Sequence, residues 1–141
     1  MSDRALRLTM AGLALVTVGI ASYLLQAHYA GNPVVCATGG CETVARSRYS
    51  EIFGVPVALV GLLGSLAILA SVSLRDVRGR ALGIALTLSG FIFAAYLVLL
   101  QLFVIDAVCE WCIANDALLA VLAALAVWRA YPGTFRMARA T

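Results

Sequence analysis

The chain is organised around residues 106–128, which read DAVCEWCIANDALLAVLAALAVW. Cys109 and Cys112 stand where a short polar break gives way to an apolar run that ends at Trp128. A C-x-x-C at the start of a helix places two sulfurs one turn apart, beside unpaired backbone N–H groups and the positive end of the helix dipole, which favours a thiolate over a thiol. This arrangement is typical of a redox dithiol, although the same motif also forms half of many zinc sites.

The overall composition indicates a membrane protein. Hydrophobic residues make up 63% of the chain and charged residues 12%, and the mean hydropathy is +1.00. A soluble domain has an apolar share of roughly half and a charged share of roughly a quarter. The net charge of +3 comes from arginine, since the chain has no lysine, and we interpret it as a determinant of membrane topology, with no nucleic-acid partner.

Four apolar stretches are each long enough to cross a hydrocarbon core of about 30 Å at about 1.5 Å per residue. The first follows Arg4 and Arg7 and is too long for the apolar region of a cleaved signal peptide. The second is expected to begin near Pro56, because proline suits the first turn of a helix. The sequence predicts a single domain over residues 1–141 with spans at about 8–28, 54–74, 81–105 and 109–129.

The loop between the first two spans, roughly residues 28–51, holds the other two cysteines. Gly39 and Gly40 let the segment between Cys36 and Cys41 turn back on itself. The two cysteines can then reach the Cα separation of about 4.4–6.8 Å that a disulfide needs. We therefore expect the loop to carry a second cysteine pair.

The arginines divide unequally between the two sides of the membrane. Eight lie before the first span, between the second and third spans or after the fourth, and the other two, Arg46 and Arg48, lie in the first loop. Arginine-rich flanks stay in the cytoplasm, so both termini are predicted to be cytoplasmic. All four cysteines then lie on the outer side, where disulfides persist.

The order and spacing of these residues resemble the vitamin K epoxide reductase family, in particular its bacterial homologues. The resemblance rests on the paired cysteines of the first loop, on Ser47 six residues after Cys41, on Phe53-Gly54 before the second span and on the C-x-x-C that opens the fourth. It covers the chain from the first span to about Ala120. Order, spacing and side of the membrane match together, which makes the resemblance more specific than a C-x-x-C alone.

The resemblance implies an all-α membrane protein, a four-transmembrane-helix bundle around a quinone with a short extra helix in the first extracytoplasmic loop. It implies an enzyme of the bacterial inner membrane that reoxidises a separate periplasmic thioredoxin-fold (DsbA-like) protein and passes the electrons to menaquinone or ubiquinone. Cys109 and Cys112 match the active-site pair, with Cys112 nearest the quinone. Cys36 and Cys41 match the shuttle pair, and Ser47 matches a polar residue near the active site.

Thiol–disulfide exchange supports the same order of events without the family. A partner thiolate attacks a Cys36–Cys41 disulfide, and the freed loop thiolate attacks a Cys109–Cys112 disulfide through a mixed disulfide. The spacing does not decide which loop cysteine meets the partner, although the shorter tether to the loop helix favours Cys41 for contact with Cys109. The reduced pair then needs a two-electron acceptor, and a quinone dissolved in the bilayer is available.

Asp116 is an ionisable residue inside the fourth span. Cys109, Cys112 and Asp116 are spaced i, i+3 and i+7, so they share one stripe of a helix. A charged side chain inside a span costs about 2.5–3.5 kcal/mol on insertion scales and indicates a functional site by default. We expect Asp116 either to deliver a proton to the quinone, or to pair with Arg46 or Arg48 or hydrogen-bond a neighbouring helix.

Residues around the cysteines carry further expectations. Ser50 and Glu51, at the start of the second helix, are candidates for a hydrogen bond to the quinone. His28 is expected to be an interfacial residue, and as the single histidine of the chain it cannot build a multi-histidine metal site. Glu110 and Trp111, between Cys109 and Cys112, either tune the reduction potential of the pair or face water and lipid headgroups, and we favour the second. Four other residues are expected to pack either against the quinone ring or against a neighbouring helix, and we favour core packing: Phe53, Tyr96, Leu99 and Phe103.

Three classes of function remain open from the sequence. The first is the thiol–quinone oxidoreductase, in which the four cysteines are catalytic and the quinone contacts are Cys112, Asp116, Ser47, Ser50 and Glu51. The second is a structural four-span protein whose outer disulfides brace a loop. The third is a metal-binding or transport module with a four-cysteine zinc site, against which the oxidising side and the lack of helping histidines argue.

Overall fold

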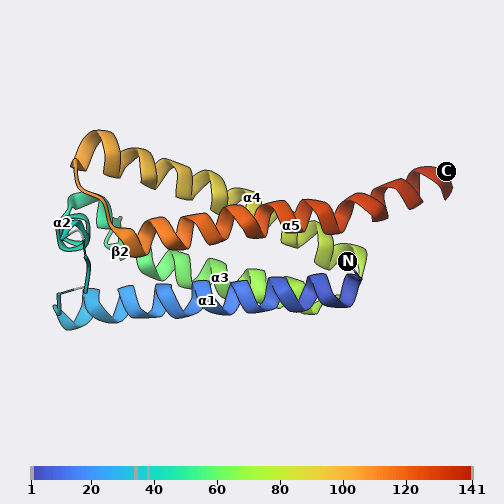
Figure 1. Cartoon of the computed structure of the whole chain (residues 1–141), viewed down its shortest axis with the longest axis horizontal. Coiled ribbons are helices and arrows are strands. Elements are labelled where there is room, and N and C mark those ends of the chain that lie inside the picture. The colour runs from blue at the N-terminus through green and yellow to red at the C-terminus, as the bar shows by residue number, and fades with distance from the viewer. Residues whose placement is uncertain (1, 34, 38, 141) are drawn as a thin grey trace.

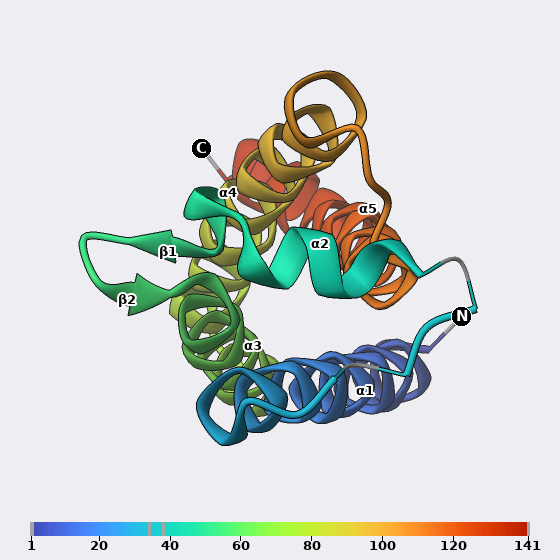
Figure 2. The same cartoon turned by 90° about the vertical axis from the view of Figure 1, so that its left-hand side faces the viewer.

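Four long helices lie side by side and form one bundle (Figure 1). The computed structural model describes residues 2–33, 35–37 and 39–140, with their side chains up to residue 131. Helix α1 packs on α3 and α5, and α4 packs on the same two helices, so the four close into a ring that Figure 2 shows end-on. The bundle helices are α1 (Asp3–Ala30), α3 (Val57–Ser73), α4 (Val77–Leu100) and α5 (Glu110–Ala140).

The first loop forms a layer across one end of the bundle (Figure 2). Helix α4 continues without a break into a π-helix, η2 (Gln101–Ile105), on the same side. The start of α1 and the end of α5 lie at the opposite end (Figure 1). The loop contains the short helix α2 (Gly40–Arg46), the 3-10 helix η1 (Arg48–Ser50) and an antiparallel hairpin of two short strands, β1 (Glu51–Ile52) and β2 (Val55–Pro56).

The expected fold class is confirmed, since the chain forms an all-α membrane bundle of four helices with a short extra helix in the first loop. Among the described residues, three helical stretches are long and apolar enough to cross a membrane: Asp3–Ala30, Val77–Ile105 and Glu110–Tyr131. Helix α3 has 17 residues. It therefore covers about 26 Å of a core of about 30 Å. It begins later than expected because Val55 and Pro56 form strand β2.

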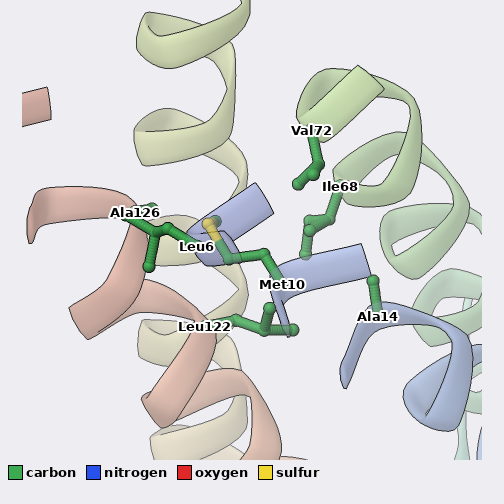
Figure 3. Packing of buried hydrophobic residues seen from close by; sticks show 7 residues of the cluster. All are labelled: Leu6, Met10, Ala14, Ile68, Val72, Leu122 and Ala126. Carbon is green, nitrogen blue, oxygen red and sulfur yellow. The ribbon is translucent and has the colours of Figure 1, made fainter. Parts of the chain in front are cut away.

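The best-buried apolar cluster lies between α1, α3 and α5 (Figure 3). Met10 and Leu122 are almost completely buried there. Small residues such as Ala14 and Ala126 let the helices approach closely, which is how membrane helices gain packing energy. The cluster belongs to the half of the bundle that is far from the first loop, and its members are Leu6, Met10, Ala14, Ile68, Val72, Leu122 and Ala126.

The outer surface of the bundle is also apolar. Four residues that were expected in the core are exposed, and that prediction was wrong. In a membrane the surrounding lipid is as apolar as the core, so hydrophobicity alone does not identify the inner face of a helix. Phe53 differs from the other three because it lies in the hairpin turn, where its φ is +51°. The four are Tyr96 (52% exposed), Leu99 (54%), Phe103 (76%) and Phe53, which is fully exposed.

Arginines close the end of the bundle that is far from the loop. The carbonyl groups at the C-terminal end of α3 lack intrahelical partners, as at any helix end. Arg7 donates to two of them, at 3.0 and 3.2 Å, and Arg129 donates to the Leu74 carbonyl at 3.1 Å. Arg129 is almost completely buried and also pairs with Asp3 at 3.4 Å. These two side chains therefore fix the short helix α3 against α1 and α5.

Candidate active site

Two cysteine pairs meet at the end of the bundle that the first loop covers. In the loop, Cys36 and Cys41 form a disulfide with their Cα atoms 6.0 Å apart. Cys41 lies in the first turn of α2 and is buried, whereas Cys36 precedes the helix and is half-buried. The expected loop pair is therefore present, with one sulfur turned into the molecule and the other nearer its surface.

The second pair, Cys109 and Cys112, consists of free thiols at the start of α5. Cys109 directly precedes the helix and is buried. The Cys112 thiol donates a hydrogen bond to Cys109 Sγ at 2.7 Å, and the Cys112 N–H lies 3.3 Å from the same sulfur. These donors, chiefly the thiol, stabilise a thiolate and lower the pKa of Cys109 despite its burial. Cys109 is therefore prepared to act as a nucleophile.

A buried glutamine holds the chain segment that leads into this pair. Gln101 begins η2 and is 3% exposed. Its side-chain oxygen accepts the Cys109 N–H at 2.8 Å, and its carbonyl accepts the Ala107 N–H at 3.2 Å. The chain turns at Asp106, which has a φ of +54°. Gln101 was not predicted from the sequence, where its signal is a lone amide within an apolar span.

Contacts between the loop and α5 fix the position of the loop cysteine pair relative to Cys109 and Cys112. The Glu110 carboxylate accepts the Ala37 N–H at 2.7 Å. The Trp111 indole donates to the Val35 carbonyl, and its ring packs on that of Tyr23 with the centroids 5.2 Å apart. Glu110 and Trp111 are half-buried, so they remain partly accessible to water or headgroups as expected. The backbone partners that the folded loop brings to both side chains were not predicted.

A glycine lets α2 approach the second pair closely. A Cβ added at Gly40 would overlap the carbonyl oxygen of Val108 and lie 2.8 Å from its nitrogen. Gly40 directly precedes Cys41, and Val108 directly precedes Cys109. The contact between these two backbones therefore brings one cysteine of each pair onto neighbouring chain segments.

A cavity of about 310 Å³ lies between the loop layer and the bundle, and Cys41, Cys109 and Cys112 all line it. Most of its wall is apolar. A volume above about 300 Å³ with an apolar wall and a few polar groups suits a small organic ligand. The aliphatic residues of the wall come from α1, α2, α3, α4 and η2, and they include Leu24, Ala27, Val44, Val57, Leu97 and Ile105.

Of the four other residues predicted to contact the quinone, three line the cavity, namely Ser47, Ser50 and Asp116. Glu51 is not among the lining residues. It pairs at 3.0 Å with His28, which does line the cavity. His28 thus has a defined partner beside the cavity, and Glu51 reaches the cavity only through it.

Asp116 differs from the other charged residues nearby. Its Oδ2 atom is buried and has no hydrogen-bond partner among the described residues. The pairing with Arg46 or Arg48 that the sequence left open is not formed. Arg46 pairs with Glu42 at 2.6 Å, and the Arg48 guanidinium lies 5.7 Å from the centre of the Tyr49 ring. The cavity wall therefore contains a carboxyl group with an uncommitted oxygen.

Fold and site together define a class of protein. The chain is a multi-pass membrane protein in which a loop disulfide and a free dithiol share one cavity, an arrangement consistent with a thiol–disulfide oxidoreductase. Residues 8–127 match the sequence profile of the Vitamin K epoxide reductase family, and the chain belongs to this family. The match contains all four cysteines and reaches into all four bundle helices. In general, the family carries quinone-linked thiol–disulfide oxidoreductase activity.

Proposed function

We propose that this protein is a bacterial inner-membrane enzyme that reoxidises a separate thioredoxin-fold (DsbA-like) protein and passes the electrons to menaquinone or ubiquinone. The observation that carries the proposal is the shared cavity, which Cys41, Cys109 and Cys112 line together. An electron relay through two cysteine pairs needs the loop pair, Cys36 and Cys41, within reach of the inner pair, Cys109 and Cys112. It also needs the inner pair within reach of the electron acceptor. One cavity meets both requirements.

The partner protein meets the loop pair first. Cys36 is the more exposed of the two cysteines, so a partner thiolate attacks its sulfur, forms a mixed disulfide and releases the Cys41 thiolate. The second partner thiol attacks the mixed disulfide, frees Cys36 and leaves the partner oxidised. Both loop cysteines are then reduced.

The Cys41 thiolate carries the electrons inward. It attacks Cys109 of an oxidised Cys109–Cys112 disulfide and releases the Cys112 thiolate. Cys36 then attacks Cys41, which re-forms the loop disulfide and leaves the inner pair reduced. An oxidised loop pair beside free Cys109 and Cys112 corresponds to this stage of the cycle.

The relay ends on the quinone. Both Cys109 and Cys112 line the cavity, and Cys112 is the less buried of the two, so we assign its sulfur as the one nearest the quinone ring. Two electrons leave the inner pair as the Cys109–Cys112 bond forms. The quinone takes these electrons together with two protons and becomes a hydroquinone.

Polar groups of the loop supply the remaining contacts to the quinone. The hydroxyl groups of Ser47 and Ser50 donate to backbone carbonyls at 2.7 and 2.8 Å. Their protons are therefore engaged, and their lone pairs are suited to accept from a hydroquinone hydroxyl. Glu51 contributes by holding His28 at the cavity wall.

We further propose that both termini are cytoplasmic and that all four cysteines are periplasmic. The arginine count supports this orientation. The loop and the two chain ends lie at opposite ends of the bundle (Figure 1), so the cysteines and the termini are assigned to opposite sides. A membrane-impermeant maleimide applied to intact spheroplasts after reduction should label Cys36. It should leave Arg4→Cys, tested in a variant without the native cysteines, unlabelled. Labelling of the cysteine introduced at position 4, together with an unlabelled Cys36 in the wild type, would show that the protein has the opposite orientation.

A quinone assay with two electron donors tests the proposed function. The purified protein in lipid nanodiscs receives a quinone and either a reduced thioredoxin-fold protein or dithiothreitol, and quinone absorbance is followed. Cys112→Ala should abolish consumption with both donors. Cys36→Ala should abolish it with the protein donor and retain it with dithiothreitol, which is small enough to reach the inner pair directly. A wild type that consumes no quinone and keeps its cysteines in disulfides would favour a structural four-span protein.

A further inference from the structure

Asp116 is the cavity carboxyl group that has no partner for its buried oxygen among the described residues. Glu42 and Arg46 also line the cavity, but they form an ion pair with each other at 2.6 Å. His28 is engaged by Glu51 at 3.0 Å. The other charged side chains of the cavity wall are thus paired, and Asp116 is available to a ligand. Tyr49 also lines the cavity, but its phenol is a far weaker acid than a carboxyl group.

Asp116 is placed to contact the same ligand as Cys112. The two residues lie one helical turn apart on one face of α5, and both line the cavity. A quinone that contacts Cys112 Sγ therefore lies against the carboxyl group. An unpaired carboxylate is costly in an apolar wall, whereas the protonated acid is a hydrogen-bond donor. A quinone oxygen needs a donor, and the hydroxyl protons of Ser47 and Ser50 are already engaged.

We infer that Asp116 is the catalytic acid that donates a proton to the quinone oxygen during reduction. The inference rests on the proposed function and adds the source of a proton to it. In the balanced step, Cys109 thiolate, Cys112 thiol, Asp116 carboxylic acid and quinone give the Cys109–Cys112 disulfide, Asp116 carboxylate and hydroquinone. The sulfurs lose two electrons, and one proton comes from Cys112 and one from Asp116. Water reprotonates Asp116 after the hydroquinone leaves.

Three substitutions separate proton donation from shape. Asp116→Asn keeps the size and a hydrogen-bond donor without an acidic proton, Asp116→Glu keeps the acid, and Asp116→Ala leaves room for a small acid. The reduced protein in nanodiscs is mixed with ubiquinone-1 and hydroquinone formation is followed in one turnover, without the thiol partner. We expect Asp116→Asn and Asp116→Ala to slow this step by about 10²–10⁴-fold, the usual contribution of a general acid. Asp116→Glu should retain most of the rate.

Chemical rescue gives a readout that a structural role would not move. Acetic acid, added at constant pH and ionic strength, should restore part of the rate of Asp116→Ala with saturation. Acetamide, which has the same size and no acidic proton, should not. In steady state, Asp116→Asn should lower kcat and leave the KM for quinone unchanged, and thiol exchange between the partner and the loop pair should proceed at the wild-type rate.

Several results would overturn the inference. They are a wild-type rate in Asp116→Asn, a change confined to KM, and equal rescue of Asp116→Ala by acetic acid and acetamide. If Asp116→Asn does not fold, the comparison of Asp116→Glu with Asp116→Ala in the presence of acetic acid decides the question. A wild type that reduces no quinone would overturn the proposed function instead, so the two failures are distinguishable.

Discussion

The two ends of the bundle use polar side chains in opposite ways. At the end that is far from the loop, Arg7 and Arg129 donate hydrogen bonds to carbonyls at the end of α3, next to the buried apolar cluster. At the cysteine end, Asp116 has a buried oxygen with no partner in the part of the chain that the structure describes, and the exposed Phe53 has a positive φ. Such features persist where the rest of the structure stabilises them, and they gather at functional sites. The difference indicates that one end supplies stability and the other carries the chemistry.

The largest effect should come from removing the uncommitted carboxyl group. Asp and Leu differ by about 3 kcal/mol at the centre of a membrane helix on insertion scales. Asp116→Leu should therefore raise the free energy of unfolding by up to about 3 kcal/mol. The gain is smaller the farther Asp116 lies from the centre of the membrane. Quinone reduction should be lost in the same variant. Unfolding in nanodiscs with increasing denaturant measures the first effect, and a less stable Asp116→Leu would show that the carboxyl group is structural.

At the end of the bundle that is far from the loop, removing a charged side chain should lower the stability of the protein. Arg129→Leu removes the hydrogen bond from the guanidinium to the Leu74 carbonyl, and a hydrogen bond to a charged group contributes about 1.5–3 kcal/mol. We expect that loss of stability, with quinone turnover per folded molecule unchanged. Arg75→Leu is the matched control, because Arg75 is exposed in the turn before α4 and should leave stability unchanged. Equal losses in the two variants would refute a special role for the buried arginine.

A single substitution at Gly40 should disrupt the close contact between the loop and the segment that leads into α5. Gly40→Ala places a methyl group against the Val108 backbone, so α2 must move away from the inner pair. Turnover with the protein donor should fall by about tenfold, equivalent to about 1.4 kcal/mol. Turnover with dithiothreitol should be retained. Gly12→Ala, at a position where the added Cβ has no neighbour within 4 Å, is the control. An unchanged rate with the protein donor would show that the contact is not needed for the relay.

A smaller gain should come from relieving the hairpin turn. A left-handed conformation costs roughly 1–2 kcal/mol for an ordinary residue and less for asparagine. Phe53→Asn should therefore stabilise the protein by about 1 kcal/mol, measured by unfolding in detergent. Val55→Asn, in the neighbouring strand, should bring no such gain. A loss of stability in Phe53→Asn would mean that the exposed ring makes a contact worth more than the strain.

The smallest effect concerns the titration of Cys109. Hydrogen bonds from Cys112 lower its pKa, so Cys109 should remain a thiolate to a lower pH than an ordinary cysteine and protonate only below that pH. Cys112→Ala removes the largest cause, and the midpoint should move upward. The thiolate absorbance of the inner pair, followed against pH in a background without the loop cysteines, measures the shift. A midpoint that stays in place would contradict the assigned cause.

Local spacing made much of the fold predictable. Apolar length indicated the bundle, and the glycines between Cys36 and Cys41 indicated a turn that closes a disulfide. The hairpin was not predicted, because phenylalanine is an unusual residue for the positive φ that its turn requires. The exposure of Tyr96 and Phe103 was missed because lipid and protein core favour the same side chains.

The candidate site was predictable in its cysteines and less so in the groups that hold them. The spacing of Cys112 and Asp116 on one helix face already placed both beside one ligand, and the structure puts both in the cavity wall. The bonds from Gln101 to Cys109 and from Glu110 to the loop join segments whose approach depends on the whole fold. No local pattern specifies such contacts.

The central claim is that electrons pass from the loop pair to the inner pair through a bond between Cys41 and Cys109. One cross-linking measurement tests this claim most directly. In a variant that keeps Cys41 and Cys109 and carries Cys36→Ala and Cys112→Ala, mild oxidation followed by mass spectrometry should reveal a Cys41–Cys109 disulfide. The complementary variant, which keeps Cys36 and Cys112, should form far less. A disulfide between Cys36 and Cys112, with none between Cys41 and Cys109, would contradict the relay.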